Sequence, residues 1–231
     1  CDALTYSDNC AGDVTCEAQP EVIVPGECPS EYVITRKWNV TDACDNMSVH
    51  TQIVTVVDTT SPVITAASDE TVECDGMGNA EALDAWLANN GGATATDNCE
   101  GELTWTNDFE GLSDLCGATG AATVTFTVTD CAGNSSSSTA TFTIEDTTAP
   151  VFDPYNTSEA VECSDADPTD ITYMPITAQD ECSDVTYSID AYCMSGGCLW
   201  TMMRVWTATD DCGNSTTVEQ YLMLTDNTAP V

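Results

Sequence analysis

The sequence predicts an all-β protein built of tandem antiparallel β-sandwiches that are stapled by disulfides, with one short helix inserted. Three observations support this prediction. The same blocks of sequence recur three times, segments between turn residues alternate apolar residues with Thr or Ser, and 14 cysteines are spread over 231 residues. Alternation with a period of two is the pattern of a half-buried strand.

The recurring blocks divide the chain into three repeats, 1–63, 64–151 and 152–231. Their endings are VVDTTSPV, IEDTTAPV and LTDNTAPV, preceded by TDACDN, TDCAGN and TDDCGN and, further upstream, by SDNC, TDNC and QDEC. A VEC block at 72–74 and 161–163 has no counterpart in the first repeat, which begins at the corresponding Cys1. The first repeat therefore lacks its first strand, and we expect an open sheet edge that a neighbouring chain or another segment must fill.

The segments between the blocks read as strands. ATVTFTVTD (122–130) and STATFTIED (138–146) flank the turn residues Cys-Ala-Gly-Asn, which predicts a hairpin. Its counterparts are VITRKWNVTD with QIVTVVD in the first repeat and MRVWTATD with EQYLMLTD in the third. Several short strands per repeat with turn signals between them indicate immunoglobulin-like sandwiches.

One insertion in the second repeat has helical periodicity instead. In residues 79–90, Leu83, Trp86 and Leu87 recur at helical spacing, with Asn79 as a candidate N-cap and Gly91 as a stop.

The combined pattern VEC, TDNC, RxWxxTDxC and DTTAPV resembles the hyalin-repeat (HYR) and HYR-like modules of extracellular proteins, and the resemblance covers all three repeats. It implies immunoglobulin-like sandwiches of long surface or matrix proteins, used for adhesion or as spacers.

The composition of the chain limits which partners it can bind and in which compartment it is found. With 39 acidic and 3 basic residues the formal net charge is −36, so neither phosphate neutralisation on nucleic acid nor binding to an anionic membrane is available. No segment is long and apolar enough for membrane insertion. Cysteines outside CxxC pairs and a single histidine disfavour zinc and predict disulfides in an extracellular or cell-surface setting.

Four cysteines recur in register in each repeat, and we expect the first two and the last two of each set to pair, although three connectivities are open for each set. The disulfide candidates are Cys1, Cys10, Cys28, Cys44, Cys74, Cys99, Cys116, Cys131, Cys163, Cys182, Cys198 and Cys212. Cys16 and Cys193 are left over. They pair either within their own repeats, for instance Cys193 with Cys198, or between repeats or subunits.

Aspartates recur at the strand ends and in the linkers that join the repeats, which suggests that several converge. Converging carboxylates favour calcium, and the alternative is that each one caps a turn through backbone N–H groups. The candidate calcium ligands are Asp8, Asp42, Asp58, Asp97, Asp130, Asp146, Asp180, Asp210 and Asp226. No organic cofactor is expected.

Asn-x-Ser/Thr sequons mark candidate glycosylation sites at Asn39, Asn46, Asn134, Asn156 and Asn214. Asn46, Asn134 and Asn214 share one hairpin turn, where we expect good access. Arg36 and Arg204 each stand two residues before a Trp, which predicts a structural role through a carboxylate or a ring.

Enzyme motifs such as GxSxG, HExxH and the P-loop are absent from the sequence, so no enzyme is predicted. We expect a structural subunit or segment of an extracellular filament or long surface adhesin, whose partners are copies of itself, joined head to tail by strand complementation. The alternative is a module of a larger secreted protein that binds surface glycan or other matrix proteins.

Overall fold

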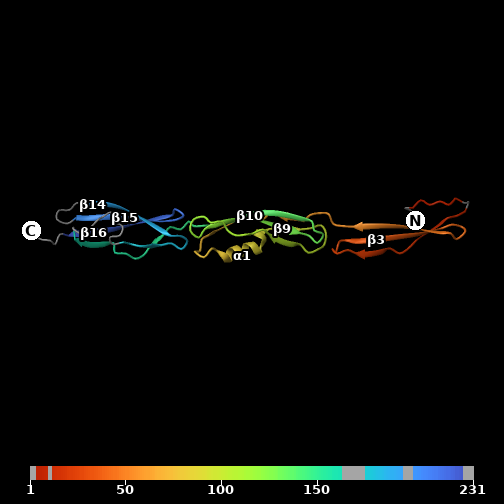
Figure 1. Cartoon of the computed structure of the whole chain (residues 1–231), viewed down its shortest axis with the longest axis horizontal. Coiled ribbons are helices and arrows are strands. Elements are labelled where there is room, and N and C mark those ends of the chain that lie inside the picture. Colours follow the sequence, from red (N-terminus) through yellow and green to blue (C-terminus); the bar gives the residue numbers. More distant parts are fainter. Residues whose placement is uncertain (1–3, 10–11, 163–174, 195–199, 226–231) are drawn as a thin grey trace, which may run out of the picture. The chain divides into compact units, whose positions relative to one another are not determined.

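The computed structural model describes residues 4–9, 12–162, 175–194 and 200–225. These residues form strands and one α-helix (Figure 1), in agreement with the predicted all-β, disulfide-stapled sandwich fold. Contacts group the chain into two compact units, residues 1–67, 92–108 and 125–139 in one and residues 68–91, 109–124 and 140–231 in the other. The boundaries of the three sequence repeats remain a prediction.

Three larger sheets hold most strands. The first has β3 (Tyr32–Thr41) between β4 (Met47–Val56) on one side and β1 (Thr15–Ala18) and β2 (Val22–Pro25) on the other. The second has the order β6 (Glu70–Glu73), β10 (Ser135–Glu145), β9 (Gly120–Thr129), β8 (Thr104–Asn107). The third has the order β12 (Ser158–Glu162), β16 (Ser215–Thr225), β15 (Trp200–Asp210), β14 (Val185–Met194).

Two smaller ladders accompany them. They pair β5 (Val63–Thr65) with β7 (Thr94–Thr96), and β11 (Val151–Phe152) with β13 (Ala178–Gln179), both antiparallel.

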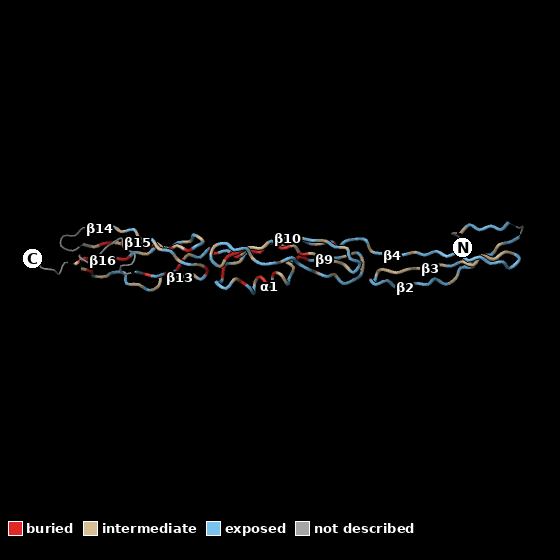
Figure 2. The backbone as a smooth tube through the Cα atoms, in the orientation of Figure 1, coloured by how far each residue is buried: buried red, intermediate tan, exposed pale blue. Residues whose placement is uncertain are grey.

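The predicted hairpins are confirmed, and two of them, β9–β10 and β15–β16, hold most of the buried apolar residues. In β9, Val124, Phe126 and Val128 are fully buried and alternate with less buried residues. In the third sheet, Met202, Leu222 and Leu224 pack with Val161 of β12. Figure 2 shows the buried residues following β9, β10 and the strands around β16, while β2, β3 and β4 are largely tan and pale blue.

An added parallel strand covers the last strand of two hairpins. β6 pairs in parallel with β10, and β12 pairs in parallel with β16; both carry the VEC blocks. Among the described residues, β4 pairs with β3 alone. Within this part of the chain no strand pairs with the other edge of β4, and the absence of a first strand from the first repeat remains a prediction.

The inserted helix α1 spans Ala80–Ala88 and buries Leu83 and Trp86. The Trp86 ring lies 5.5 Å from the ring of Phe142, measured between centroids. Asn79 occupies the N-cap position, but its side chain makes no cap hydrogen bond there. It has a left-handed φ of 50°, and its amide instead donates to the Glu73 carbonyl at 2.8 Å. The helix stops before Gly91, which has a φ of 62° that favours glycine.

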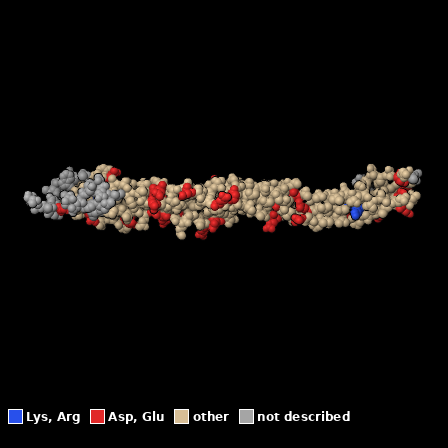
Figure 3. Space-filling view, in the orientation of Figure 1, with Lys and Arg blue, Asp and Glu red and all other residues tan. Residues whose placement is uncertain are grey.

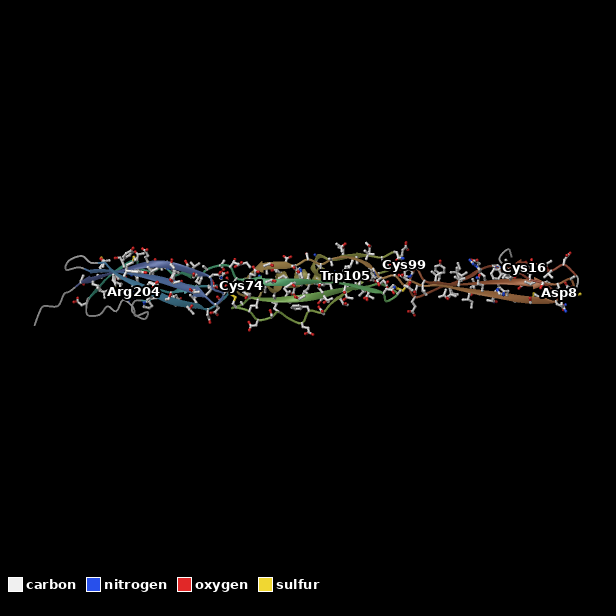
Figure 4. The ribbon with its side chains drawn as sticks, turned by 90° about the horizontal axis from the view of Figure 1, so that it is seen from above. Asp8, Cys16, Cys74, Cys99, Trp105 and Arg204 are labelled. Carbon is white, nitrogen blue, oxygen red and sulfur yellow. A yellow bond between two sulfur atoms is a disulfide. The ribbon has the colours of Figure 1, made fainter. Side chains whose placement is uncertain are left out.

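The two arginines that recur in register have different surroundings, and the expected carboxylate partner is found for Arg36. Arg204 is fully buried in β15, where Figure 4 labels it, and Arg36 makes an exposed 2.6 Å ion pair with Glu21. Trp206 is buried next to Arg204 and donates a hydrogen bond to Gln220 at 3.0 Å, so its ring serves packing. No helix in the described part of the chain is both long and apolar enough to cross a membrane.

Candidate cation sites and disulfides at the strand ends

One turn is built three times at the tips of the hairpins. In each, an Asp that ends or follows the first strand accepts a hydrogen bond through Oδ1 from the backbone N–H of the Asn four residues later. The three pairs are Asp42 with Asn46, Asp130 with Asn134 and Asp210 with Asn214, at 2.9, 2.8 and 2.8 Å. The predicted turn-capping role of these aspartates is thus present in the structure.

The Asn side chain then reaches the linker that ends the preceding repeat. Asn134 Nδ2 donates to the Asp58 carbonyl at 3.3 Å, and Asn214 Nδ2 donates to the Asp146 carbonyl at 2.9 Å. Asn46 donates to Asp42 Oδ2 at 2.8 Å, and no linker carbonyl accepts from it among the described residues. Two of the three turns therefore hold a preceding linker, and the turn at Asn46 does not.

These contacts bring predicted aspartates together in two equivalent clusters. In one, ligand atoms of Asp58, Asp97 and Cys99 lie within 4.8 Å of one another, and Asp130 lines the same pocket. In the other, ligand atoms of Asp146, Asp180 and Cys182 lie within 4.8 Å.

The oxygens of these carboxylates divide into two roles. Oδ1 caps turns: Asp97 accepts from the Cys99 N–H at 2.8 Å, Asp180 from the Cys182 N–H at 2.8 Å, and Asp146 from the Thr148 N–H at 3.2 Å. In contrast, the Oδ2 atoms of Asp97, Asp146 and Asp210 are buried and have no hydrogen-bond partner. Turn capping and convergence of carboxylates, the two alternative roles considered for the recurring aspartates, therefore occur in the same residues.

Burial and neighbouring negative charges both raise the pKa of Asp146. Its side chain is 9% exposed, and burial raises the pKa of its carboxyl above the usual 3.8, with further upward contributions from the charges of Asp180 and Asp210. Asp210 is 4% exposed. A buried carboxylate without a partner is costly unless a proton or a cation compensates it.

The residues present fit a hard divalent cation such as Ca²⁺. The donors at the second cluster are carboxylate oxygens, of which Asp146 Oδ2 is buried and unpartnered, and Ca²⁺ prefers oxygen ligands. The Cys182 sulfur is bonded to Cys74 and offers no thiolate, which disfavours a thiolate-bound metal there.

Not all predicted ligands are brought together. Asp8 is exposed, and Asp42 lies in the turn that holds no linker. Asp226 lies outside the described residues. By sequence register, Asp8 corresponds to Asp97 and Asp180. Asp42 corresponds to Asp130 and Asp210, and Asp226 corresponds to the linker residues Asp58 and Asp146.

Acidic side chains are spread over the surface of the described residues. Figure 3 shows carboxylate side chains along the face drawn, with little basic surface among the described residues. Local cations therefore offer the carboxylates little compensation.

The predicted disulfide pairing is wrong wherever the structure tests it. The bonds are Cys28–Cys131, Cys74–Cys182 and Cys116–Cys212, with Cα–Cα distances of 5.7, 6.0 and 5.2 Å. Each joins a cysteine of one repeat to a cysteine of the next. Cys74, labelled in Figure 4, belongs to the VEC block that leads into this junction.

Strand length explains the error. Cys28 and Cys44 stand at opposite ends of β3, a strand of 10 residues, and Cys116 and Cys131 stand at opposite ends of the 10-residue β9. Such a strand is about 33 Å long at ~3.3 Å per residue, far beyond the reach of a disulfide. The long alternating segment between the two cysteines was the sequence signal that could have excluded pairing within a repeat.

The remaining cysteines complete the correction. Cys44 and Cys99 are free thiols, although both were expected to pair. Cys16 is disulfide-bonded, and Cys193 lies in β14. Cys1, Cys10, Cys163 and Cys198 lie outside the described residues.

A residue that the sequence analysis missed ties the linker to the sheet. Glu73 accepts from the Thr147 N–H and hydroxyl, both at 2.8 Å, and these bonds lower the pKa of its carboxyl. Glu73 precedes the cysteine of the VEC block, so the recurrence of that block was the available signal.

The expected access at the turn sequons is not found for two of them. Asn134 and Asn214 are half-buried and use their amide nitrogens in hydrogen bonds, because they hold the linkers. Asn46 and Asn156 are exposed, and Asn39 is half-buried in β3.

No protein-family model and no curated protein sequence matches the chain. The resemblance to hyalin repeats therefore remains a prediction. Solved structures similar to this chain include protocadherin gammaB7 EC3-6 as a cis-dimer, with a TM-score of 0.35, 16% identity and coverage of 93% of this chain and 67% of that one. Drosophila N-cadherin EC1-4 has a TM-score of 0.35, 10% identity and coverage of 94% and 67%. Protocadherin Gamma B2 domains 1-5 has a TM-score of 0.36, 14% identity and coverage of 85% and 46%.

Proposed function

We propose that this chain is an extracellular structural subunit of HYR-like repeats, which joins copies of itself end to end into a filament or long surface adhesin. The observation that carries the proposal is the open edge of β4, at the position where β10 and β16 are each covered by a parallel strand. Completion of an open sheet edge by a strand from another chain is an established mode of assembly.

The open edge of β4 has backbone N–H groups that can pair with another strand. When the three repeats are aligned on their linker aspartates, Ile53 of β4 corresponds to Thr141 of β10 and Tyr221 of β16. The backbone N–H of Thr141 donates to Asp69 and that of Tyr221 to the Thr157 carbonyl, so both point toward the added strand. Alternation then assigns the N–H groups of Ile53, Thr55 and Val57 to the open edge.

The apolar face beside this edge is also uncovered. Val54 and Val56 are half-buried, whereas their counterparts Phe142 and Leu222, and Ile144 and Leu224, are between 0% and 9% exposed. A strand that paired with β4 would place its alternate side chains over Val54 and Val56. Burial of such apolar surface contributes about 25 cal/mol per Å².

Calcium would stiffen the joints between repeats. The residues that would hold it are Asp146 and Asp180, with Asp210 near enough for its charge to act on Asp146, and in the equivalent cluster Asp58, Asp97 and Asp130. A bound cation supplies positive charge to carboxylates that otherwise repel one another.

The disulfides indicate the compartment in which the protein is found. Disulfides between successive repeats persist in an oxidising compartment, and the surface is acidic. We infer an extracellular or cell-surface location and a role without catalysis, since no recognisable catalytic motif accompanies the clusters.

Edge blocking tests the proposal. Thr55→Pro removes one outward N–H without removing a β3–β4 bond, and Thr55→Ala keeps it, which makes the second variant the matched control. With the native disulfides intact, particle length is measured by electron microscopy and light scattering for both variants with calcium and with a chelator. We expect end-to-end particles for Thr55→Ala and their loss for Thr55→Pro; equal assembly of both variants contradicts strand complementation.

The alternative, a binding module, has one supporting feature. An open groove of about 440 Å³ is lined by residues that include Pro154, Tyr155, Glu159 and Gln220. A glycan array with the full chain tests it. Saturable binding that Tyr155→Ala removes, in a chain that forms no end-to-end particles, favours this function over the structural one.

A further inference from the structure

The outer face of the first sheet is apolar and exposed. Trp38 of β3 corresponds by sequence register to the buried Trp206, so Lys37 and every second residue of β3 lie on the opposite face, which we call the outer face. Paired residues of neighbouring strands share a face, and the register therefore places five apolar side chains of β2 and β4 on the face of Lys37. These five are between 54% and 66% exposed and are Val22, Val24, Met47, Val49 and Ile53.

The outer face of the second sheet has a different composition. When the repeats are aligned on their linker aspartates, Val49 and Ile53 correspond to Ser137 and Thr141 of β10. The same alignment pairs Lys37 with Thr125 of β9. The fold therefore accepts hydroxyl residues at these positions and does not itself need apolar ones. Exposed apolar patches of soluble proteins often mark surfaces that bind a partner.

Lys37 limits the kind of partner. It is the only lysine of a chain with 39 acidic residues, it is exposed, and it forms no ion pair in the described part of the chain. It lies on β3, a central strand, so it does not serve to protect a sheet edge from pairing. A cation beside exposed apolar residues is complementary to a surface that combines apolar residues with carboxylates.

The outer face of the third sheet has this combination. Asp190, Val205 and Glu219 form one row across β14, β15 and β16. Asp190 is exposed and makes no hydrogen bond or ion pair within the described residues. The adjacent row on the same face is apolar and consists of Tyr192, Met203 and Tyr221, of which Tyr192 is 51% exposed.

The rows of the two faces occur in the same order. On β3, the row of Val22 and Ile53 lies two residues before Lys37, and on β15 the row of Met203 lies two residues before Val205. If the two sheets face each other with β3 and β15 in the same direction, Lys37 lies opposite the acidic row and the apolar rows lie opposite each other. Facing sheets are about 10 Å apart, a distance that a lysine and a carboxylate side chain can span together. With the strands in opposite directions, the apolar row would face the row of Thr207 instead.

We propose that the outer face of the first sheet of one copy packs on the outer face of the third sheet of a second copy, with Lys37 beside Asp190 and Glu219. The two faces are different, so each copy keeps one of them free, and the contact can continue from copy to copy. It uses sheet faces and not the open edge of β4. The inference therefore goes beyond the proposed end-to-end joining, because it holds chains side by side.

Zero-length cross-linking tests the contact. A 1:1 mixture of ¹⁵N-labelled and unlabelled full chain, with native disulfides, is treated with a water-soluble carbodiimide, which joins an amine directly to a carboxylate. About 0.15 M salt screens the repulsion between acidic copies beyond about 8 Å. Because Lys37 is the only lysine, every cross-link from a side-chain amine begins there. We expect mass spectrometry to find peptides that join Lys37 of a labelled chain to Asp190 or Glu219 of an unlabelled one.

Charge reversal measures the contribution of the pair. Sedimentation velocity should show association weakened about tenfold or more in Lys37→Glu and in Asp190→Lys, and restored when both changes are present in one chain. Glu110→Lys is the control for Asp190→Lys, because it makes the same charge change at an exposed residue outside both faces, and it should associate like wild type.

Three outcomes overturn the proposal. They are cross-links of Lys37 only within one chain, association of Lys37→Glu equal to that of wild type, and a wild type that stays monomeric, which would leave the face to a different partner. Electron microscopy of the same samples separates this contact from the proposed function. End-to-end particles that persist in Lys37→Glu, while the cross-links between chains disappear, support a separate side-by-side contact.

Discussion

The side-chain amide of Asn214 donates a 2.9 Å hydrogen bond to the main-chain carbonyl of Asp146, which lies 68 residues earlier in the chain. The bond joins a hairpin turn to the linker that precedes its repeat. Asn134 and Asp58 repeat the relationship at 3.3 Å. Asn46 has the same turn, but in the described residues its amide donates to Asp42 Oδ2 and to no linker carbonyl, so the two kinds of turn can be compared within one chain.

This comparison predicts unequal costs of removing the amide. Asn214→Ala deletes a half-buried bond to a carbonyl, and we expect the free energy of unfolding to fall by about 0.5–1.5 kcal/mol. Asn46→Ala deletes only an exposed bond to Asp42, and a smaller loss is expected. Urea unfolding of the two variants measures the difference; equal losses would show that the linker bond contributes nothing.

Replacement of Asp146 should have opposite effects with and without calcium. Asp146→Asn removes a buried charge whose Oδ2 has no partner, so in a chelator the melting temperature rises. In calcium, the variant loses a ligand and the calcium-induced rise in melting temperature shrinks. Asp211→Asn removes the same charge at an exposed neighbouring position and serves as the control in scanning calorimetry. A calcium response unchanged by Asp146→Asn would rule out this cluster as the site.

Asp146 and Asp42 should contribute to the pH dependence of stability in opposite directions, on either side of the ordinary aspartate pKa of 3.8. Because burial raises the pKa of Asp146, the folded state binds more protons there, and in a chelator stability falls as pH rises from 3.8 through the folded pKa. The hydrogen bond from the Asn46 side chain lowers the pKa of Asp42, so its contribution is present above 3.8 and is lost as pH falls through the folded pKa. Unfolding curves over a pH series check both windows. Asp146→Asn should flatten the upper one, and an unchanged slope there would contradict the assignment.

The disulfides between repeats should dominate stability. Cys116 and Cys212 close a loop of 96 residues, and their joint replacement by Ser should lower the free energy of unfolding by about 2–5 kcal/mol. Cys44→Ser removes a free thiol and should leave the stability of the monomer unchanged. Guanidinium unfolding of isolated monomers provides the measurement. If the double variant is as stable as Cys44→Ser, the Cys116–Cys212 disulfide contributes nothing to the free energy of unfolding.

Glycan occupancy should follow the hydrogen bonds of the sequons. Asn134 uses its amide nitrogen for both the Asp58 carbonyl and Asp130 Oδ2, so a sugar on that nitrogen would break the turn. Asn156 is exposed, and its amide nitrogen donates only to the exposed side chain of Glu159 and holds no main-chain group, so it should accept a glycan in a eukaryotic secretory host. Mass spectrometry of glycopeptides compares the two sites; high occupancy of Asn134 in folded material would contradict this view.

The sequence was sufficient for features that depend on local patterns. Alternation in 122–130 and 138–146 predicted the hairpin of β9 and β10, and the spacing of Leu83 and Trp86 predicted α1, because burial of one face requires that period. The recurrence of Asp at strand ends likewise predicted that carboxylates would meet.

Pairing between distant residues was decided only by the tertiary structure. Cys28 bonds Cys131 and not Cys44 because a 10-residue strand separates the two cysteines of one repeat, while the turn of the next repeat lies within 5.7 Å, measured between Cα atoms. The same arrangement decides which oxygens of Asp146 and Asp210 are left without partners. Periodicity is a property of neighbouring residues along the chain, whereas disulfides and carboxylate clusters depend on which strand ends the fold brings together.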